Sequence, residues 1–196
     1  ASSAGALGDT WEYDGAGLTW TLRTPLAAGP GLRFWFQLVF DAARNRTLLF
    51  GGTPDATVQF ADTWVWDGQA GVWTLLNPPA HPRGRQLYTL AYDSIRQLVL
   101  LQCGTWVDYG GISVDRESWE WDGTTWNNLT FKYFYCCPRT GGGMVYDSGL
   151  QQMVLFGGFG ALHEAIWTLR AAWSGPSVFV DWQNSGTQDG SFNHPF

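Results

Sequence analysis

The sequence predicts an all-β protein built from repeated units of four antiparallel strands. Three phrases recur in a fixed order with a period of about fifty residues, and each period holds four short apolar runs divided by turn residues. The composition agrees, because 16% of the residues are aromatic and 25 of 196 are glycine, which favours short strands and tight turns. No helical periodicity of 3.6 residues competes with this pattern.

The first phrase is aromatic and acidic and ends in glycine. It is written DTWEYDG at residues 9–15, DTWVWDG at 62–68 and ESWEWDG at 117–123. Its tryptophans alternate along the third strand of each unit, where we expect them to fill the space between stacked units. The Asp-Gly pair predicts the tight turn to the fourth strand, because glycine accepts the positive φ that such turns need. This phrase is therefore interpreted as structural.

The second phrase predicts the second strand and the third phrase opens the first strand. The second phrase reads LLFGG at 48–52, LLQCG at 100–104 and VLFGG at 154–158, and its glycine pair is a device for close packing rather than a phosphate cradle. The third phrase is an arginine eight residues before an aspartate that follows an aromatic residue, and the arginines are Arg33, Arg85 and Arg139. We expect each arginine to pair with a carboxylate such as Asp62 or Glu117. The alternative is a ring of arginines that binds an anion in a central channel.

Four strands per period are typical of a propeller blade, and the second full period places them at 86–92, 97–101, 118–121 and 125–129. The order of arginine, aromatic-Asp, FGG, DTWxWDG and a tryptophan in the last strand resembles bacterial kelch repeats of the galactose-oxidase-like propeller class over residues 9–182. The last-strand tryptophans are Trp20, Trp73 and Trp126. The family usually has histidine three residues after the arginine, whereas this chain has Phe36, Tyr88 and Gly142. No residues match the copper and tyrosyl-radical site of galactose oxidase, so the resemblance implies the fold and not that activity.

Counting the phrases predicts an incomplete ring. The kelch-like segment at 1–182 divides into a half blade at 9–22 and blades at 25–76, 77–129 and 130–182, and a tail or linker follows at 183–196. Propellers normally close with 4–8 blades, so this segment would leave open flanks covered in tryptophan, phenylalanine and leucine. We therefore expect a homodimer in which two copies close the ring around a two-fold axis.

The tail carries a second resemblance. Residues 180–196 are similar to the opening of right-handed parallel β-helix domains, which implies that the chain is a segment of a larger, secreted or cell-surface protein. Asp181, Asn184 and Asp189 offer oxygen ligands for Ca²⁺ in a glycine- and serine-rich loop, and the alternative is an ordinary linker.

The bulk properties exclude several classes of function. A net charge of −6 argues against a nucleic-acid surface, which needs a basic stripe. No apolar stretch is long enough to span a membrane, and the HExxH, GxSxG and GxxxxGK[ST] motifs are absent. The three cysteines, Cys103 and the neighbours Cys136 and Cys137, are expected to be small buried thiols rather than to include a vicinal disulfide.

The topology of such blades gathers the long loops on one face. These loops lie between blades at 24–32, 77–84 and 131–138, and between second and third strands at 53–61, 105–116 and 159–164. A divalent metal such as Zn²⁺ could be bound there by residues that share ligand chemistry, namely His81, His163, Asp108, Asp115 and Glu164. Arg116, Arg139 and Tyr109 are the candidate catalytic residues, with the arginines holding a developing anion. The alternative is that all of these are solvated loop residues.

The sequence favours a binding or interaction scaffold whose site lies on the long-loop face. Its ligand would be a small molecule, a glycan or a protein. The alternative is a metal-dependent hydrolase of phosphate or carboxyl esters at that face or at the dimer interface. A third possibility is a structural spacer in an extracellular array.

Overall fold

The computed structural model describes residues 5–24, 29–108, 110–129, 139–160, 166–174 and 177–184, with the last two segments described as backbone only. The elements in these residues are β-strands, as the sequence predicts. Among them no helix has the length and apolar character that crossing a membrane requires.

Three antiparallel sheets of four strands follow a sheet of two strands. The half blade pairs β1 (Thr10–Asp14) with β2 (Thr19–Thr24). Blade 1 contains β3 (Gln37–Asp41), β4 (Arg46–Phe50), β5 (Thr63–Asp67) and β6 (Val72–Leu76). Blade 2 contains β7 (Thr89–Asp93), β8 (Leu98–Gln102), β11 (Ser118–Trp121) and β12 (Trp126–Asn128). Blade 3 contains β14 (Gly143–Asp147), β15 (Gln152–Phe156), β17 (Ile166–Ser174) and β18 (Ser177–Asn184).

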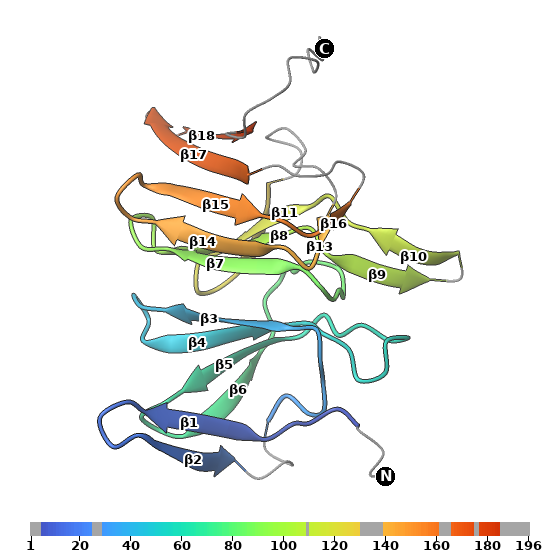
Figure 1. The fold of residues 1–196 in the computed structure, drawn as a ribbon, viewed down its shortest axis with the longest axis vertical. Helices are drawn as coiled ribbons and strands as arrows, with labels where there is room; N and C mark the ends of the chain where they lie inside the picture. Colours follow the sequence, from blue (N-terminus) through green and yellow to red (C-terminus); the bar gives the residue numbers. More distant parts are fainter. Residues whose placement is uncertain are drawn as a thin grey trace.

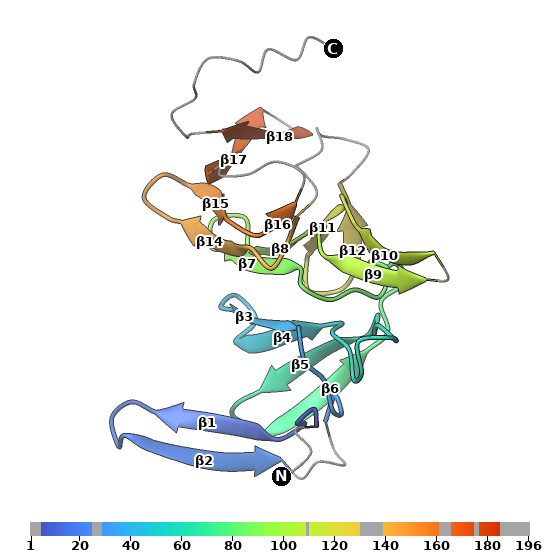
Figure 2. The same cartoon turned by 45° about the vertical axis from the view of Figure 1, so that its right-hand side comes forward.

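The four sheets are stacked in chain order along the long axis of the molecule (Figure 1, Figure 2). The first strands of the three blades lie next to one another, β3 beside β7 and β7 beside β14. Backbone hydrogen bonds join the residues that lead into these three strands. The Leu87 N–H donates to Trp35 O at 3.1 Å, and the Gly141 N–H donates to Leu87 O at 2.8 Å. All three residues have a left-handed φ, so each copy of the repeat makes the same turn two residues after its arginine.

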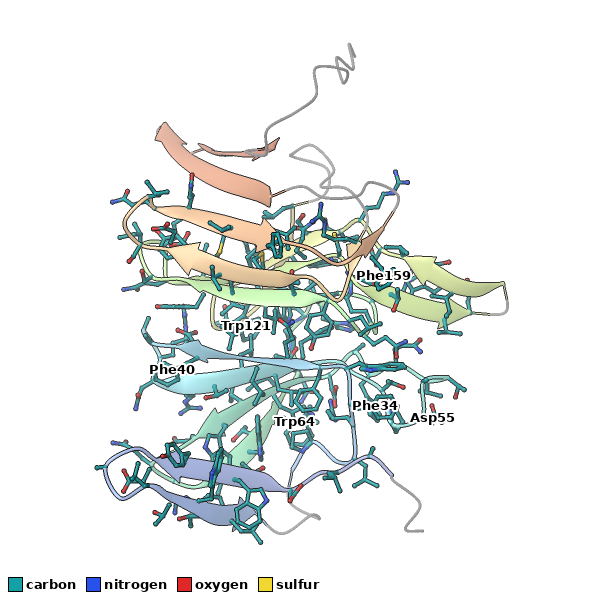
Figure 3. The ribbon with its side chains drawn as sticks, in the orientation of Figure 1. Phe34, Phe40, Asp55, Trp64, Trp121 and Phe159 are labelled. Carbon is teal, nitrogen blue, oxygen red and sulfur yellow. The ribbon has the colours of Figure 1, made fainter. Side chains whose placement is uncertain are left out.

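Two hydrophobic cores fill the spaces between blades, as the sequence predicts. The core between blades 1 and 2 includes Phe50 from one side and Trp121 and Trp126 from the other, and Trp121 lies between the sheets in Figure 3. The core between blades 2 and 3 includes Leu100 and Met153. Each buried tryptophan removes on the order of 150–250 Å² from water, so Trp121 and Trp126 contribute much of the apolar area buried between blades 1 and 2.

The repeated phrase also supplies hydrogen bonds between neighbouring blades. Trp126 Nε1 donates to Thr63 Oγ1 at 3.0 Å, and Trp73 Nε1 donates to Thr10 Oγ1 at 2.8 Å. In both cases a fourth-strand tryptophan reaches the threonine that precedes the first tryptophan of the preceding phrase. The Thr-Trp pair of the phrase is therefore a contact point between blades as well as part of a strand.

The predicted pairing of arginine with carboxylate is confirmed in blades 1 and 2. Arg33 binds Asp62 through two bonds of 2.9 Å, and Arg85 Nη2 binds Glu117 at 2.6 Å. Arg33 Nη1 also donates to Gly51 O and Arg85 Nη1 to Cys103 O, at 2.8 and 3.1 Å. The arginines thus fasten the start of the first strand to the glycine pair of the second.

The turns after the phrase differ in one detail from the prediction. Gly123 takes the expected left-handed conformation with φ of 99°. Gly15 and Gly68 do not, because these turns contain four residues and their left-handed positions are Leu18 and Gly71. The aspartate shapes the turn instead. In blade 1, Asp67 Oδ1 accepts the backbone N–H groups of Gln69 and Ala70, each at 3.0 Å.

The open flank at the half blade is apolar, in line with the sequence. Trp11, Tyr13 and Trp20 are 50%, 49% and 65% exposed. At the other end of the chain, β18 runs to Asn184, so Asp181 and Asn184 belong to a strand rather than to a loop. Asp189 and the rest of the tail lie outside the described residues, as do Cys136 and Cys137, whereas Cys103 is buried as expected.

Candidate binding face

The long loops lie on one side of the stack and the short turns lie on the other. Figure 3 places Phe34, Asp55 and Phe159 on the long-loop side and Phe40 on the opposite side. We call the first side the loop face. Within the described residues it is formed by the segments 53–61, 77–84, 105–108 and 110–116 and by the short pair β13 (Arg139–Thr140) and β16 (Phe159–Gly160).

The most prominent feature of the loop face is a hairpin, where the sequence predicts a loop at 105–116. β9 (Thr105–Asp108) pairs with β10 (Gly111–Val114), and the hairpin projects from blade 2 in Figure 1. Apolar and polar residues alternate in β10, as Ile112, Ser113 and Val114, and the turn begins at Asp108, whose Oδ1 accepts the Gly110 N–H at 2.8 Å. This alternation and the turn residues are signals that could have revealed the hairpin.

The loop at 53–61 is held in shape by its own side chains. Thr53, which is fully buried, donates from Oγ1 to Val58 O at 2.6 Å and accepts the Ala56 N–H at 2.8 Å. Asp55 Oδ1 accepts the backbone N–H and the hydroxyl of Thr57 at 2.9 and 2.8 Å. These bonds from Thr57 lower the pKa of Asp55 below its ordinary value. The loop is therefore preorganised.

Contacts across the blade boundary join this loop to the hairpin. Gln59 Oε1 accepts the Val107 N–H at 3.0 Å. Beside it, the guanidinium of Arg83 lies 4.1 Å from the centre of the Trp106 ring. Gly84 fits against the Gln59 carbonyl so closely that a Cβ there would lie 2.6 Å from its oxygen. Blades 1 and 2 thus present one continuous surface.

Apolar side chains stand out from this surface. Val58, Ile112 and Phe159 are 55%, 73% and 87% exposed. Exposed apolar side chains on a preorganised polar frame are typical of surfaces that bind a partner.

Among the predicted metal ligands, His81 and Asp108 are exposed on loop-face segments. Asp115 is buried and is engaged with structural groups, since it lies 3.1 Å from Arg85 and accepts the Glu117 N–H at 2.8 Å. His163 and Glu164 lie outside the described residues. In the part of the chain that is described, no three His, Cys, Asp or Glu side chains are grouped so that they could hold a metal. The five-residue metal site stays a prediction.

The candidate catalytic residues have different surroundings. Arg116 is exposed next to the hairpin, and Tyr109 at the hairpin turn is outside the described residues. Arg139 is buried and donates from Nη1 to Gly157 O at 3.0 Å, as its counterparts Arg33 and Arg85 do in their blades. For Arg33 and Arg85 the carboxylate partners already neutralise the guanidinium, which favours the structural reading over an anion-binding ring.

Tyr88, three residues after Arg85, links blades 1 and 2. Tyr88 is buried, donates to the Phe50 carbonyl and accepts the Gln37 N–H at 3.1 Å. Burial raises the pKa of this hydroxyl well above its ordinary value, so it stays protonated. Tyr88 therefore ties the inner strands of blades 1 and 2 together.

No protein family and no curated protein matches the chain. The chain is similar to the solved structure of YjhT, a kelch-repeat propeller protein, with a TM-score of 0.66 and 14% sequence identity. The match covers 88% of this chain and 52% of YjhT, so the chain spans about half the length of that structure. At this identity the likeness shows the fold, which agrees with the all-β blades described above.

Proposed function

We propose that this chain is a binding scaffold without catalytic activity, and that its loop face holds a protein or glycan ligand. The observation that carries the proposal is the fusion of two blades into one surface through Gln59 and Val107. Binding residues usually lie on loops that a rigid scaffold positions, and here the loop at 53–61 is held in shape by its own hydrogen bonds.

The chemistry of the face supports a macromolecular ligand. Ile112 and Phe159 present apolar area, and the Arg83–Trp106 pair adds an aromatic surface with a cation above it. Aromatic residues and arginine are the side chains that contribute most to binding at protein interfaces.

The proposal is tested by screening the purified chain against a glycan array and a displayed-peptide library, followed by matched variants. Ile112→Asp places a charge on the loop face, and Val72→Asp places one on β6 at a site that is 48% exposed. We expect Ile112→Asp to weaken the retained ligand at least tenfold and Val72→Asp to leave it unchanged. A ligand that both variants bind equally well would place the site elsewhere.

A metal-dependent hydrolase is the second candidate, and the exposure of His81 and Asp108 on loop-face segments favours it. Zn²⁺ or another divalent ion bound by these side chains, with ligands contributed by His163 or Glu164, would activate water for ester hydrolysis. Arg116 would then be available for the developing anion. Ester turnover that chelation abolishes and zinc restores, and that the His81→Ala variant lacks, would establish this activity.

We also propose that the open, apolar flank of the half blade drives homodimerisation, and that the parent protein is secreted or displayed on the cell surface. The exposure of Trp11 and Trp20 supports the first part. Sedimentation of the purified chain tests it, because Trp20→Glu should shift a dimer to monomer, and a wild-type chain that stays monomeric at high micromolar concentration would refute it.

A further inference from the structure

A pocket lies between blades 1 and 2 on the short-turn side of the molecule, opposite the loop face. It has a volume of about 340 Å³, which is in the range of pockets that hold small ligands. Val65, Leu76 and Trp121 line its apolar part, and Arg44 and Arg46 contribute two cations. Both walls belong to complete blades, so neither end of the chain borders the pocket.

One residue of the repeated phrase differs at this junction. The fourth position of the phrase is Glu12 in the first copy and Glu120 in the third, whereas the second copy has Val65. The two glutamates show what this position does when it carries a carboxylate. Because valine is shorter and uncharged, the junction between blades 1 and 2 lacks that carboxylate.

The glutamate of the first copy accepts a hydrogen bond from a tryptophan of the next blade. Glu12 Oε1 accepts the Trp66 Nε1–H at 2.8 Å. The counterpart of Trp66 in blade 2 is Trp121, which is 2% exposed, lies between the sheets in Figure 3 and lines the pocket with Val65. In the part of the chain that the structure describes, no group accepts the Trp121 indole N–H. Buried indole N–H groups usually have an acceptor, so this donor favours one from a ligand.

The glutamate of the third copy binds the arginine of the turn between the first two strands. Arg96 donates from Nε to Asp93 at 2.7 Å and from Nη1 to Glu120. Its counterpart in blade 1 is Arg44, which binds Asp41 at 2.8 Å and no second carboxylate among the described residues. Arg44 donates instead to two backbone carbonyls of blade 2. These carbonyls carry no formal charge, so Arg44 lacks the second anion that Arg96 has.

Arg46 adds positive charge at the same place. The corresponding residue of blade 2 is Leu98. Arg46 lies 3.7 Å from Asp67 and its side chain is 46% exposed, so this ion pair is weak. The charged residues that line the pocket are Arg44, Arg46 and Asp41, which leaves it with a net positive charge. The pocket therefore favours an anion.

We propose that this pocket binds a small molecule with an ionised carboxylate and an apolar body. The ligand carboxylate occupies the place of the glutamate side chain that Val65 lacks. It accepts the Trp121 indole N–H and pairs with Arg44, the two interactions that glutamate makes in the other copies. The apolar body packs on Val65 and Leu76. The pocket is separate from the loop face, so this proposal is independent of the ligand proposed there.

The test uses two carboxylates of different shape, octanoate and phenylacetate, with octanamide and phenylacetamide as neutral analogues. Each is titrated into the purified chain at neutral pH by isothermal titration calorimetry. We expect saturable binding of at least one carboxylate, about tenfold tighter than its amide, because the amide lacks the charge-assisted bond to Arg44. Binding should shift the indole N–H resonance of Trp121 and leave that of Trp66, which already donates to Glu12, in place.

Matched variants locate the binding. Val65→Glu restores the residue of the other copies and should abolish binding, because the chain's own carboxylate then fills the pocket. Val65→Ala adds no carboxylate and should retain binding. Leu150→Glu adds the same charge at a turn of blade 3 that is 66% exposed and should also retain it.

Arg46→Gln provides a second test at an exposed site, in case Val65→Glu impairs folding, which circular dichroism checks. It should weaken the carboxylate about threefold and leave the amide unchanged. Failure of both carboxylates to bind saturably overturns the proposal. Amides that bind as tightly as the carboxylates overturn it too, as does carboxylate binding that Val65→Glu and Arg46→Gln both leave at the wild-type value.

Discussion

Arg33 and Asp62 are joined by two parallel hydrogen bonds, Nη1 to Oδ1 and Nη2 to Oδ2, each 2.9 Å long. Asp62 Oδ2 also accepts the Trp64 indole N–H at 2.7 Å, so one carboxylate connects the first and third strands of the blade. The same arrangement recurs with Arg85, Glu117 and Trp119. The recurrence explains why the chain repeats an acidic residue two positions before a tryptophan.

Removing the cation from this network should be costly where it is buried. Arg85 has no exposed side-chain area and binds Glu117 and Asp115 at 2.6 and 3.1 Å. Arg85→Met leaves two carboxylates without their counterion, so we expect the free energy of unfolding to fall by about 3–5 kcal/mol in urea titrations. Arg116→Met removes an exposed neighbour and should change it by less than about 0.5 kcal/mol. Equal effects of the two variants would contradict the network's structural role.

The two tryptophan hydrogen bonds between blades should contribute differently to the free energy of unfolding, because one is buried and the other is half-buried. Thr63→Val leaves the buried Trp126 Nε1 without an acceptor, and we expect a loss of about 1–3 kcal/mol in thermal or chemical unfolding. Thr10→Val breaks the equivalent bond to Trp73 at the half-exposed junction with the half blade, where water can replace the acceptor. That variant should cost less than about 1 kcal/mol. The reverse order would refute this account of the junctions.

The glycine pair should tolerate no side chain at its second position. Gly104 has φ of 105°, and a Cβ there would lie 2.9 Å from both Gln86 O and Tyr88 Cβ. We expect Gly104→Ala to lower stability by about 1–3 kcal/mol. Gly143→Ala is the matched control, because a Cβ at Gly143 meets nothing within 4 Å. If both variants have the same unfolding midpoint, the close approach of Gln86 and Tyr88 is not the reason that glycine occupies position 104.

Acid should loosen the junction between the half blade and blade 1. The hydrogen bond from Arg23, 2.6 Å long, lowers the pKa of Glu12 below its ordinary value of 4.5, and Trp66 Nε1 donates to the same carboxylate at 2.8 Å. A carboxyl with a lowered pKa stabilises the fold fully above 4.5, and this contribution is lost as pH falls through the folded-state value. The Trp66 indole resonance should therefore shift in that acidic range.

Glu12→Gln provides the control for this pH dependence, because the amide can accept from Trp66 without titrating. We expect its Trp66 resonance to be flat between pH 6 and pH 3, a range on the order of one unit either side of the ordinary carboxyl pKa. An unchanged titration in Glu12→Gln would assign the transition to another carboxyl.

The fold was predictable because each residue type in the repeat has one structural role. The acidic residue, the tryptophans and the arginine of each copy meet in the structure as expected, since Arg33 binds Asp62 and Trp126 fills the space between blades. The second copy of the glycine-pair phrase, at 100–104, departs from this pattern. Cys103 replaces the first glycine and still has φ of 57°, a conformation that costs about 1–2 kcal/mol in a residue with a side chain. Burial of its side chain offsets that cost.

The site was less predictable, because loops do not repeat. The β9–β10 hairpin breaks the blade pattern, and the link from Gln59 to Val107 joins residues 48 positions apart with no shared motif. Asp115 shows why residue type alone misleads. Its carboxylate suits a metal, and its position beside the buried Arg85 commits it to an ion pair.

The measurement that tests the central claim most directly is the metal content of the purified chain before and after chelation, with ester hydrolysis measured on the same samples. A binding scaffold predicts no stoichiometric metal and no turnover that chelation removes. Stoichiometric zinc, lost together with hydrolysis on chelation and absent from His81→Ala, would contradict that claim and establish a metal-dependent hydrolase.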